Sequence, residues 1–184
     1  NLSEVRIDGS LAKLREDLDA FMRFGLTAAE IGVHGTDVIR NGRLDSRRLN
    51  DIRQLLEKYP FAYSVHAPNP LNLMDEEDLD AHTNVMRASL EFTRQINAKV
   101  MVYHPARFQA EETFGPLGKL EISNEKQQQL LALEADLIQN FADEFPEQTI
   151  AMENARPYRY HSPYCYAEKI DELNRQVKRI NRPN

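Results

Sequence analysis

Three residues that could bind a metal ion each end a short apolar segment of this sequence. They are His66, His104 and Glu153. Two imidazoles and a carboxylate form a ligand set that suits Zn²⁺ or Mn²⁺. A divalent ion held by them could polarise a carbonyl group or lower the pKa of a bound water molecule to about 7. A carboxylate that ends an apolar run is also costly to bury without a partner. We therefore predict a metal site formed by these three side chains.

Three further residues lie where they could contact a substrate. Asp8 and His34 end the two earlier apolar segments, and Arg107 follows shortly after His104. An arginine can hold an anion through paired, charge-assisted hydrogen bonds. We expect Asp8, His34 and Arg107 to bind substrate. The alternative for each is a structural role in a turn or a place in a solvated loop.

Short apolar segments alternate with stretches of helical periodicity along the whole chain. Strands are expected over residues 5–8, 28–34, 61–66, 99–104 and 149–153. Helices are expected over residues 11–24, 46–59, 76–96, 124–144 and 165–180. Ser10, Asp75 and Ser123 or Asn124 are the expected helix caps. Five strand–helix units in a row predict an α/β fold with a parallel sheet.

An open doubly wound sheet and a (β/α) barrel both fit this alternation. The first strand–helix turn reads Asp8-Gly9-Ser10 and has no glycine-rich phosphate loop, which argues against dinucleotide binding. Side chains alternate between the two faces of a strand, so the strand-end residues lie opposite the larger apolar ones. In a barrel they would converge at the C-terminal mouth, where the active sites of parallel barrels lie.

The composition limits the classes of protein that fit. The chain has 184 residues, 41% of them hydrophobic, which favours one folded domain over residues 1–184. A single cysteine cannot form an internal disulfide, so a reducing compartment and a cytoplasmic location are expected. No apolar run approaches the roughly 18 residues that span a bilayer. A net charge of -6 disfavours general binding to nucleic acid or an anionic membrane.

Three motifs resemble the xylose isomerase-like TIM-barrel superfamily. They are Ser64-Val65-His66-Ala67-Pro68 with Asn72-Leu73 downstream, Val102-Tyr103-His104-Pro105, and Met152-Glu153-Asn154. The resemblance implies a divalent metal at the barrel mouth, held by His66, His104 and Glu153. It also implies eight strands, of which this sequence supplies the first five strand–helix units. The Asp, His and Glu expected on strands six to eight have no counterpart here.

The superfamily contains sugar isomerases and epimerases as well as endonucleases that act at abasic DNA sites. We favour a metal-dependent sugar or sugar-phosphate isomerase or epimerase. Its chemistry would be proton transfer next to a carbonyl, with Glu153 as metal ligand and base. The alternatives are a zinc-dependent apurinic/apyrimidinic endonuclease and a non-catalytic barrel that binds a partner. A small carbohydrate is the expected partner, nucleic acid is disfavoured by charge, and a homo-oligomer is a further expectation.

Overall fold

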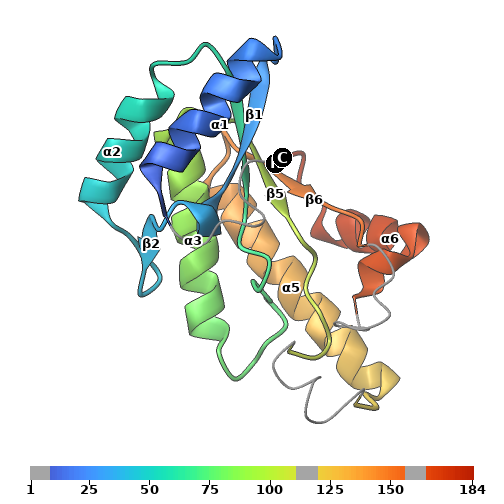
Figure 1. Cartoon of the computed structure of the whole chain (residues 1–184). Coiled ribbons are helices and arrows are strands. Elements are labelled where there is room, and N and C mark those ends of the chain that lie inside the picture. Colours follow the sequence, from blue (N-terminus) through green and yellow to red (C-terminus); the bar gives the residue numbers. More distant parts are fainter. Residues whose placement is uncertain (1–8, 111–119, 156–164) are drawn as a thin grey trace.

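The structure is a computed structural model and describes residues 9–110, 120–155 and 165–184 (Figure 1). The helices are α1 (Leu11–Arg23), α2 (Ser46–Leu56), α3 (Leu79–Gln95), α5 (Asn124–Glu144) and α6 (Ile170–Ile180). The strands are β1 (Ala28–Gly32), β2 (Ile39–Arg40), β3 (Arg43–Leu44), β4 (Ala62–His66), β5 (Val100–Tyr103) and β6 (Thr149–Met152). Two short 3₁₀ helices are η1 (Val33–Gly35) and η2 (Tyr166–Glu168). The expected strand over residues 5–8 lies outside the described residues.

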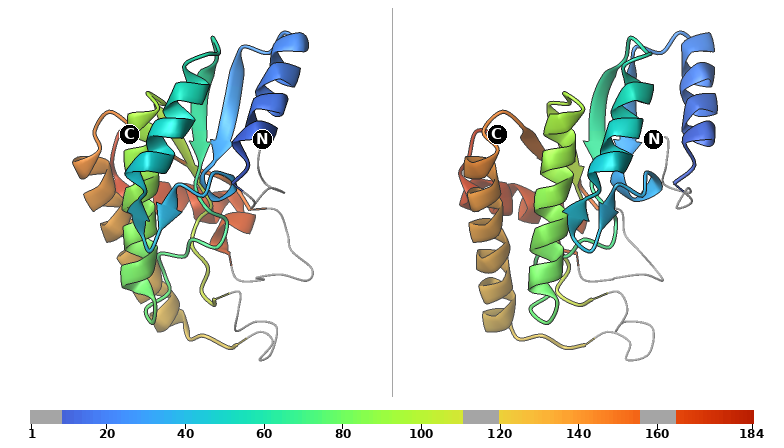
Figure 2. Two further views of the ribbon diagram at one scale, coloured as in Figure 1. Left: turned by 60° about the vertical axis from the view of Figure 1, so that its left-hand side comes forward. Right: turned by 90° about the vertical axis from the view of Figure 1, so that its left-hand side faces the viewer.

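The main sheet has the order β1-β4-β5-β6, and all its pairs are parallel. Each strand therefore pairs with the next long strand along the chain. Helices α2, α3 and α5 lie in a row along one face of the sheet (Figure 2). A doubly wound sheet would reverse its strand order and carry helices on both faces. Sequential strands with their crossover helices on one side are instead the arrangement of a (β/α) barrel, and the predicted barrel-type α/β fold is confirmed.

Local sequence signals explain where three of the helices begin. Ser10, Asp45 and Ser123 precede α1, α2 and α5, and each side chain accepts a hydrogen bond from the backbone N–H three residues further on. Such caps satisfy one of the N–H groups that the first turn of a helix leaves without a partner. Two of these caps, Ser10 and Ser123, were expected from the sequence. Gly25 follows α1 with a φ of 72°, a conformation that glycine adopts at low cost.

The predicted cap of the third helix is wrong. Helix α3 begins at Leu79, and its N-cap residue Asp78 makes no side-chain cap hydrogen bond. Asp75 Oδ1 instead accepts from the backbone N–H groups of Glu77 and Asp78, at 3.1 and 3.4 Å. Asp75 thus organises a turn before the helix, because its short side chain can bond to the backbone two and three residues on.

Several predicted boundaries extend too far. Strand β1 ends at Gly32 and not at His34, because residues 33–35 turn into η1. Helix α2 ends at Leu56, three residues before the expected end, since the chain must leave the helical conformation ahead of Pro60. The last helix begins at Ile170 and not at residue 165, because Lys169 has extended backbone angles between η2 and α6.

A hairpin of β2 and β3 occupies what was expected to be a loop over residues 35–45. Asn41 and Gly42 join its strands with φ angles of 51° and 70°. Positive φ at both positions is typical of the tight hairpin turn for which Asn-Gly is the favoured sequence. The hairpin packs against α3 and extends the layer of elements on that side of the sheet.

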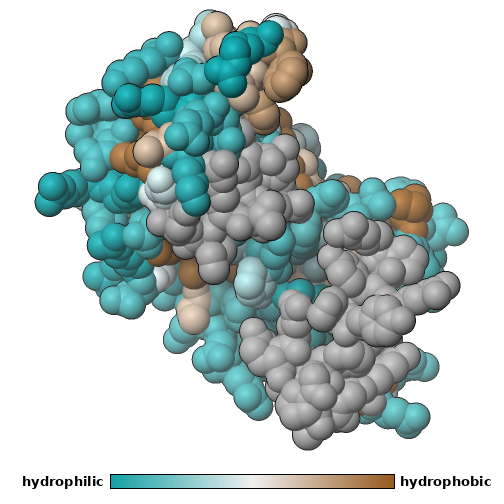
Figure 3. Space-filling view, viewed as in Figure 1, coloured by the Kyte–Doolittle hydropathy of each residue, from teal (hydrophilic) through white to brown (hydrophobic). Residues whose placement is uncertain are grey.

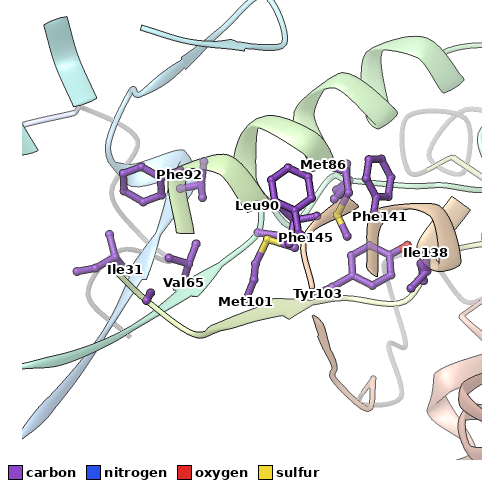
Figure 4. Close-up of a cluster of buried hydrophobic side chains, with 14 of the residues drawn as sticks. Ile31, Val65, Met86, Leu90, Phe92, Met101, Tyr103, Ile138, Phe141 and Phe145 are labelled. Atoms are coloured by element: carbon purple, nitrogen blue, oxygen red, sulfur yellow. The ribbon is translucent and has the colours of Figure 1, made fainter. Parts of the chain in front are cut away.

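The core lies between the sheet and the helix row (Figure 4). Val65, Met101 and Tyr103 point from β4 and β5 toward α3 and α5, and all three are fully buried. The surface seen in Figure 3 is mostly hydrophilic, with an apolar area over the turn from α1 to β1, where Phe24 is 80% exposed. Among the helices of the described residues, none combines the length and the apolar character that a membrane span requires.

Candidate metal centre

Three neighbouring strands deliver the predicted metal ligands to one end of the sheet. His66 is the last residue of β4, and His104 and Glu153 directly follow β5 and β6. The register pairs Val102 with Ala151, so His104 and Glu153, two residues further on, lie at the same level and on the same face. His66 pairs with Val102 and therefore lies on that face one level below His104. The predicted convergence of these side chains is thus a direct result of parallel pairing.

The three side chains are in mutual contact. Glu153 Oε2 lies 3.0 Å from His104 Nε2 and 3.5 Å from His66 Nε2. The two imidazole rings are nearly perpendicular, with their centroids 4.7 Å apart. One potential ligand atom from each residue lies within 4.8 Å of the others, and no other group of three such residues is found in the described part of the chain. The sequence prediction that these residues lie together is therefore confirmed as geometry.

The backbone fixes the orientation of the His66 ring. His66 is 3% exposed, and its Nδ1 lies 2.7 Å from the carbonyl oxygen of Ala67. A carbonyl oxygen can only accept, so Nδ1 carries a hydrogen. The other ring nitrogen, Nε2, faces the carboxylate of Glu153. A hydrogen bond on the nitrogen that points away from the site is typical of metal-binding histidines.

The surroundings of His104 favour its neutral form. Burial and the nearby imidazole of His66 lower the pKa of His104, while the Glu153 carboxylate acts in the opposite direction. A lowered pKa favours the unprotonated imidazole, which is the form that binds a metal. The His104 side chain is 37% exposed and that of Glu153 is 48% exposed, so the site opens toward solvent at the end of the sheet.

Arg107 connects two of the loops around this centre. Its backbone N–H donates to Asn72 Oδ1 at 2.9 Å, and its guanidinium donates to the carbonyl oxygen of Asn69 at 3.3 Å. The loop after β5 is thus joined to the loop after β4. These contacts give Arg107 a structural role in joining the two loops. Its predicted role in substrate binding stays a prediction.

The structure does not add the other two expected substrate-binding residues to the cluster. His34 lies in η1, because β1 ends two residues before it, and it is not part of the three-residue group. Asp8 lies outside the described residues. The predicted role of each in substrate binding therefore stays a prediction.

Sequence reasoning missed one acidic residue, Glu134 of α5. Its side chain is fully buried and accepts hydrogen bonds from four groups, which are Tyr103 Oη, the Ala106 backbone N–H, Tyr166 Oη and Gln176 Nε2. Burial raises the pKa of Glu134, and the four donated hydrogen bonds act against this rise. A signal was present, because Glu134 lies four residues after Leu130 and four before Ile138, on the apolar stripe of its helix.

A family model described as a xylose isomerase-like TIM barrel matches residues 18–184 of this chain. No curated protein matches it in sequence. Among solved structures, a D-tagatose 3-epimerase-like protein is 18% identical with a TM-score of 0.64, and the match covers 87% of this chain and 54% of that one. The D-allulose 3-epimerase from Methylomonas sp. in complex with D-allulose is 16% identical with a TM-score of 0.63, covering 97% of this chain and 56% of that one.

A third similar structure is a D-psicose 3-epimerase determined in the presence of D-fructose. It is 13% identical with a TM-score of 0.65, and the match covers 95% of this chain and 56% of that chain. At such identities the likeness establishes the fold. The chain spans a little over half the length of each of these three structures.

Proposed function

Because this chain belongs to the xylose isomerase-like TIM-barrel family, we propose that it carries the metal-binding residues of a sugar or sugar-phosphate isomerase or epimerase. The observation that carries the proposal is the contact of His66, His104 and Glu153 at the C-terminal ends of three consecutive strands. That end of a parallel barrel is where catalytic residues from several strands come together.

The donor set fits a divalent cation. Two ligands on one zinc ion, each about 2.1 Å from it at tetrahedral angles, lie about 3.4 Å apart. The two distances from Glu153 Oε2 to the imidazole nitrogens are 3.0 and 3.5 Å. Two nitrogens and one carboxylate oxygen also suit Mn²⁺, so the donors favour Zn²⁺ or Mn²⁺ without selecting between them.

The chemistry that we assign to the site is proton transfer next to a carbonyl. When bound, the divalent ion would supply Lewis-acid polarisation of the substrate carbonyl. Glu153 Oε2 faces the two histidines, and we propose that the other carboxylate oxygen, Oε1, acts as the base. It accepts a proton from the carbon beside the carbonyl. Return of that proton to the neighbouring carbon, together with passage of the hydroxyl proton to the former carbonyl oxygen, moves the carbonyl. Delivery of a proton to the opposite face of the first carbon by a second acid inverts that centre, and neither outcome needs an oxidant or reductant.

Small keto-sugars are the substrates that we propose. Similar structures were determined with D-allulose and with D-fructose. A net charge of -6 agrees with a neutral small molecule better than with a polyanion. His34 and Arg107, which lie in or just beyond turns that follow β1 and β5, are the residues that we propose to bind the substrate.

A zinc-dependent endonuclease at abasic sites is the second candidate. It is favoured by the presence of both histidines in the cluster. DNA binding needs basic side chains that are free to meet phosphates. The arginines at 43, 47, 48 and 53 form a local basic group, but Arg48 donates to the backbone carbonyl oxygens of Thr36 and Gly9. Part of this basic group is thus used inside the protein, which weakens the second candidate.

The test begins with metal content measured by mass spectrometry after reconstitution with Zn²⁺ or Mn²⁺. We expect about one or more ions per chain in the native sequence and a large loss in Glu153→Ala. Glu147→Ala is the control, because Glu147 is 78% exposed and lies far from the metal centre, beside Lys99. The metal-loaded protein is then incubated with D-allulose or D-fructose in deuterated water, and deuterium next to the carbonyl is the expected product.

Two results would contradict this proposal. A native protein that binds no metal after reconstitution would remove both enzyme candidates and leave a binding barrel. A protein that binds metal and cleaves abasic DNA, without exchanging deuterium into sugars, would replace the isomerase by the endonuclease.

A further inference from the structure

Glu134 is a buried carboxyl group with an unusually complete set of hydrogen-bond donors. Its side chain is 0% exposed. Oε1 accepts from Tyr103 Oη at 3.0 Å and from the Ala106 backbone N–H at 2.7 Å. Oε2 accepts from Tyr166 Oη at 2.6 Å and from Gln176 Nε2 at 3.0 Å. Burying a carboxylate is costly unless such donors replace water, so a fold that retains one requires a reason beyond packing.

The two donors to Oε1 lie on either side of a metal-site residue. Tyr103 immediately precedes His104, and Ala106 follows it by two positions. Tyr103 points from β5 into the core toward α5 (Figure 4). The Glu134 carboxyl group on α5 therefore accepts hydrogen bonds both from β5 and from the loop that follows it. Oε1 therefore holds both ends of the short segment that carries His104.

The two donors to Oε2 connect the same carboxyl group to the loop that carries Glu153. Tyr166 lies in η2, and the neighbouring carbonyl oxygen of Ala167 accepts from the Ala155 backbone N–H at 3.1 Å. Ala155 follows Glu153 by two residues. Segment η2 also adjoins the loop after β5, because Cys165 and Arg107 form an antiparallel bridge. Through η2, Oε2 is thus joined to both loops that leave the metal centre.

We propose that Glu134 is a positioning residue of the metal centre, which sets the separation of His104 and Glu153 by holding the loops after β5 and β6 on one buried carboxyl group. This inference rests on the metal centre proposed above. Among the described residues, Glu134 makes no hydrogen bond to His66, His104 or Glu153. It acts on them through Ala106 and Tyr166. Groups in this outer position orient the ligands and tune their affinity for metal.

The chemistry of the partners explains why a carboxylate is needed. The Ala106 backbone N–H can only donate, and Gln176 Nε2 has its orientation fixed by a second donation to the carbonyl oxygen of Leu131 at 2.7 Å. A glutamine at position 134 has nearly the same shape but offers only one acceptor oxygen. If that oxygen faced Ala106, its NH₂ group would face the NH₂ group of Gln176. Glu134→Gln should therefore retain the hydrogen bonds to Tyr103 and Ala106 on either side of His104, and weaken the contacts that hold η2.

The experiment compares Glu134→Gln, Tyr166→Phe and Tyr103→Phe with the native chain. Zn²⁺ affinity is measured by competition with a chromogenic chelator, and the visible absorption of bound Co²⁺ reports the ligand geometry. We expect a loss of Zn²⁺ affinity of about 10- to 100-fold for Glu134→Gln, as is common for outer ligands of metal sites. Each tyrosine variant removes one hydroxyl group and should give a smaller loss in the same direction, together with a changed Co²⁺ spectrum.

Ile138→Ala is the matched control. Ile138 lies one turn further along α5 on the same face and is 2% exposed, but its side chain has no polar group to hold a loop. The variant should lower the urea midpoint of unfolding through the cavity that it leaves. It should leave the Zn²⁺ affinity and the Co²⁺ spectrum of the folded protein unchanged. This comparison separates positioning from a general loss of stability.

A measurement without metal keeps the inference independent of the proposed activity. The ¹⁵N chemical shift of His104 Nε2 in the metal-free protein reports its contact with Glu153 Oε2. It should move in Glu134→Gln, in Tyr166→Phe and in Tyr103→Phe, and stay constant in Ile138→Ala. If Glu134→Gln does not fold, the two tyrosine variants provide the same readouts.

Unchanged imidazole shifts in the three positioning variants would overturn the inference, as would an equal change in Ile138→Ala. If the native protein binds Zn²⁺, an unchanged Zn²⁺ affinity in these three variants would also overturn the inference. A native protein that shows the expected shifts and affinities but exchanges no deuterium into sugars contradicts only the proposed function.

Discussion

The Nε2 atom of His104 lies 3.0 Å from Oε2 of Glu153, although 49 positions separate the two residues in the sequence. They meet because β5 and β6 pair in a register that ends both strands at the same level. His66 joins them from β4, one level below on the same face.

Removal of either imidazole should cost more metal affinity than a change further from the ion. We expect His66→Gln and His104→Gln each to weaken Zn²⁺ binding by more than the roughly 10- to 100-fold that is typical of outer-ligand changes. His34→Gln should leave the affinity unchanged, because His34 lies outside the three-residue group. Competition with a chromogenic chelator gives all three values. A loss in His34→Gln as large as that in His104→Gln would place a fourth ligand at position 34.

Arg107→Gln should discriminate between anionic and neutral ligands. The substitution retains the backbone donation to Asn72 Oδ1 and removes only the guanidinium. If Arg107 binds a substrate phosphate, its loss should cost about 1.5–3 kcal/mol of binding free energy, as is usual for charged hydrogen bonds. Calorimetric titration with a keto-sugar and with its phosphate ester measures the difference. Equal losses for both ligands would show that Arg107 acts only by joining the loops.

Cys165 should react slowly with alkylating agents in the folded protein. Burial raises the pKa of the Cys165 thiol to about 12. Since only the thiolate reacts, its fraction at pH 8 is on the order of 1000-fold below that of an ordinary cysteine. Labelling with iodoacetamide, followed by mass spectrometry, should therefore be slow under native conditions and fast in urea. Rapid native labelling would mean that the segment around Cys165 does not pack against the loop after β5 as described.

Gly42→Ala and Gly25→Ala should differ in cost although both positions have similar backbone angles. Their φ values are 70° and 72°, so alanine is strained at each, by about 1–2 kcal/mol. A Cβ atom at position 42 would lie 2.9 Å from Cβ of Asn84, whereas position 25 has no heavy atom within 4 Å. We expect the larger fall in unfolding free energy for Gly42→Ala. Urea unfolding followed by circular dichroism measures both, and equal costs would contradict the close packing of the hairpin on α3.

The sequence by itself determined the succession of the main elements and the identity of the three residues that meet at the candidate metal site. Hydrophobic periodicity located every α-helix and every strand of the main sheet in the described residues, because the burial of one face leaves a pattern within each segment. The same pattern placed His66, His104 and Glu153 at strand ends. Their convergence needed only the additional rule that consecutive parallel strands align their C-terminal ends.

Local competition at the ends of elements could not be derived from such patterns. Asp75 was expected to cap a helix and instead organises the turn before it. His34 was expected to end a strand and lies in η1. The energies that separate these outcomes are small, about 1 kcal/mol for a helix cap, and the surrounding structure decides between them.

The network around Glu134 was decided by the tertiary structure alone. Its donors come from β5, the loop after it, η2 and α6, and positions 103 and 176 are separated by most of the C-terminal half of the chain. An acidic residue on an apolar stripe indicates only that a buried partner must exist. Which groups satisfy it depends on how four elements pack, because the cost of burying the charge is offset only when all of them are in place.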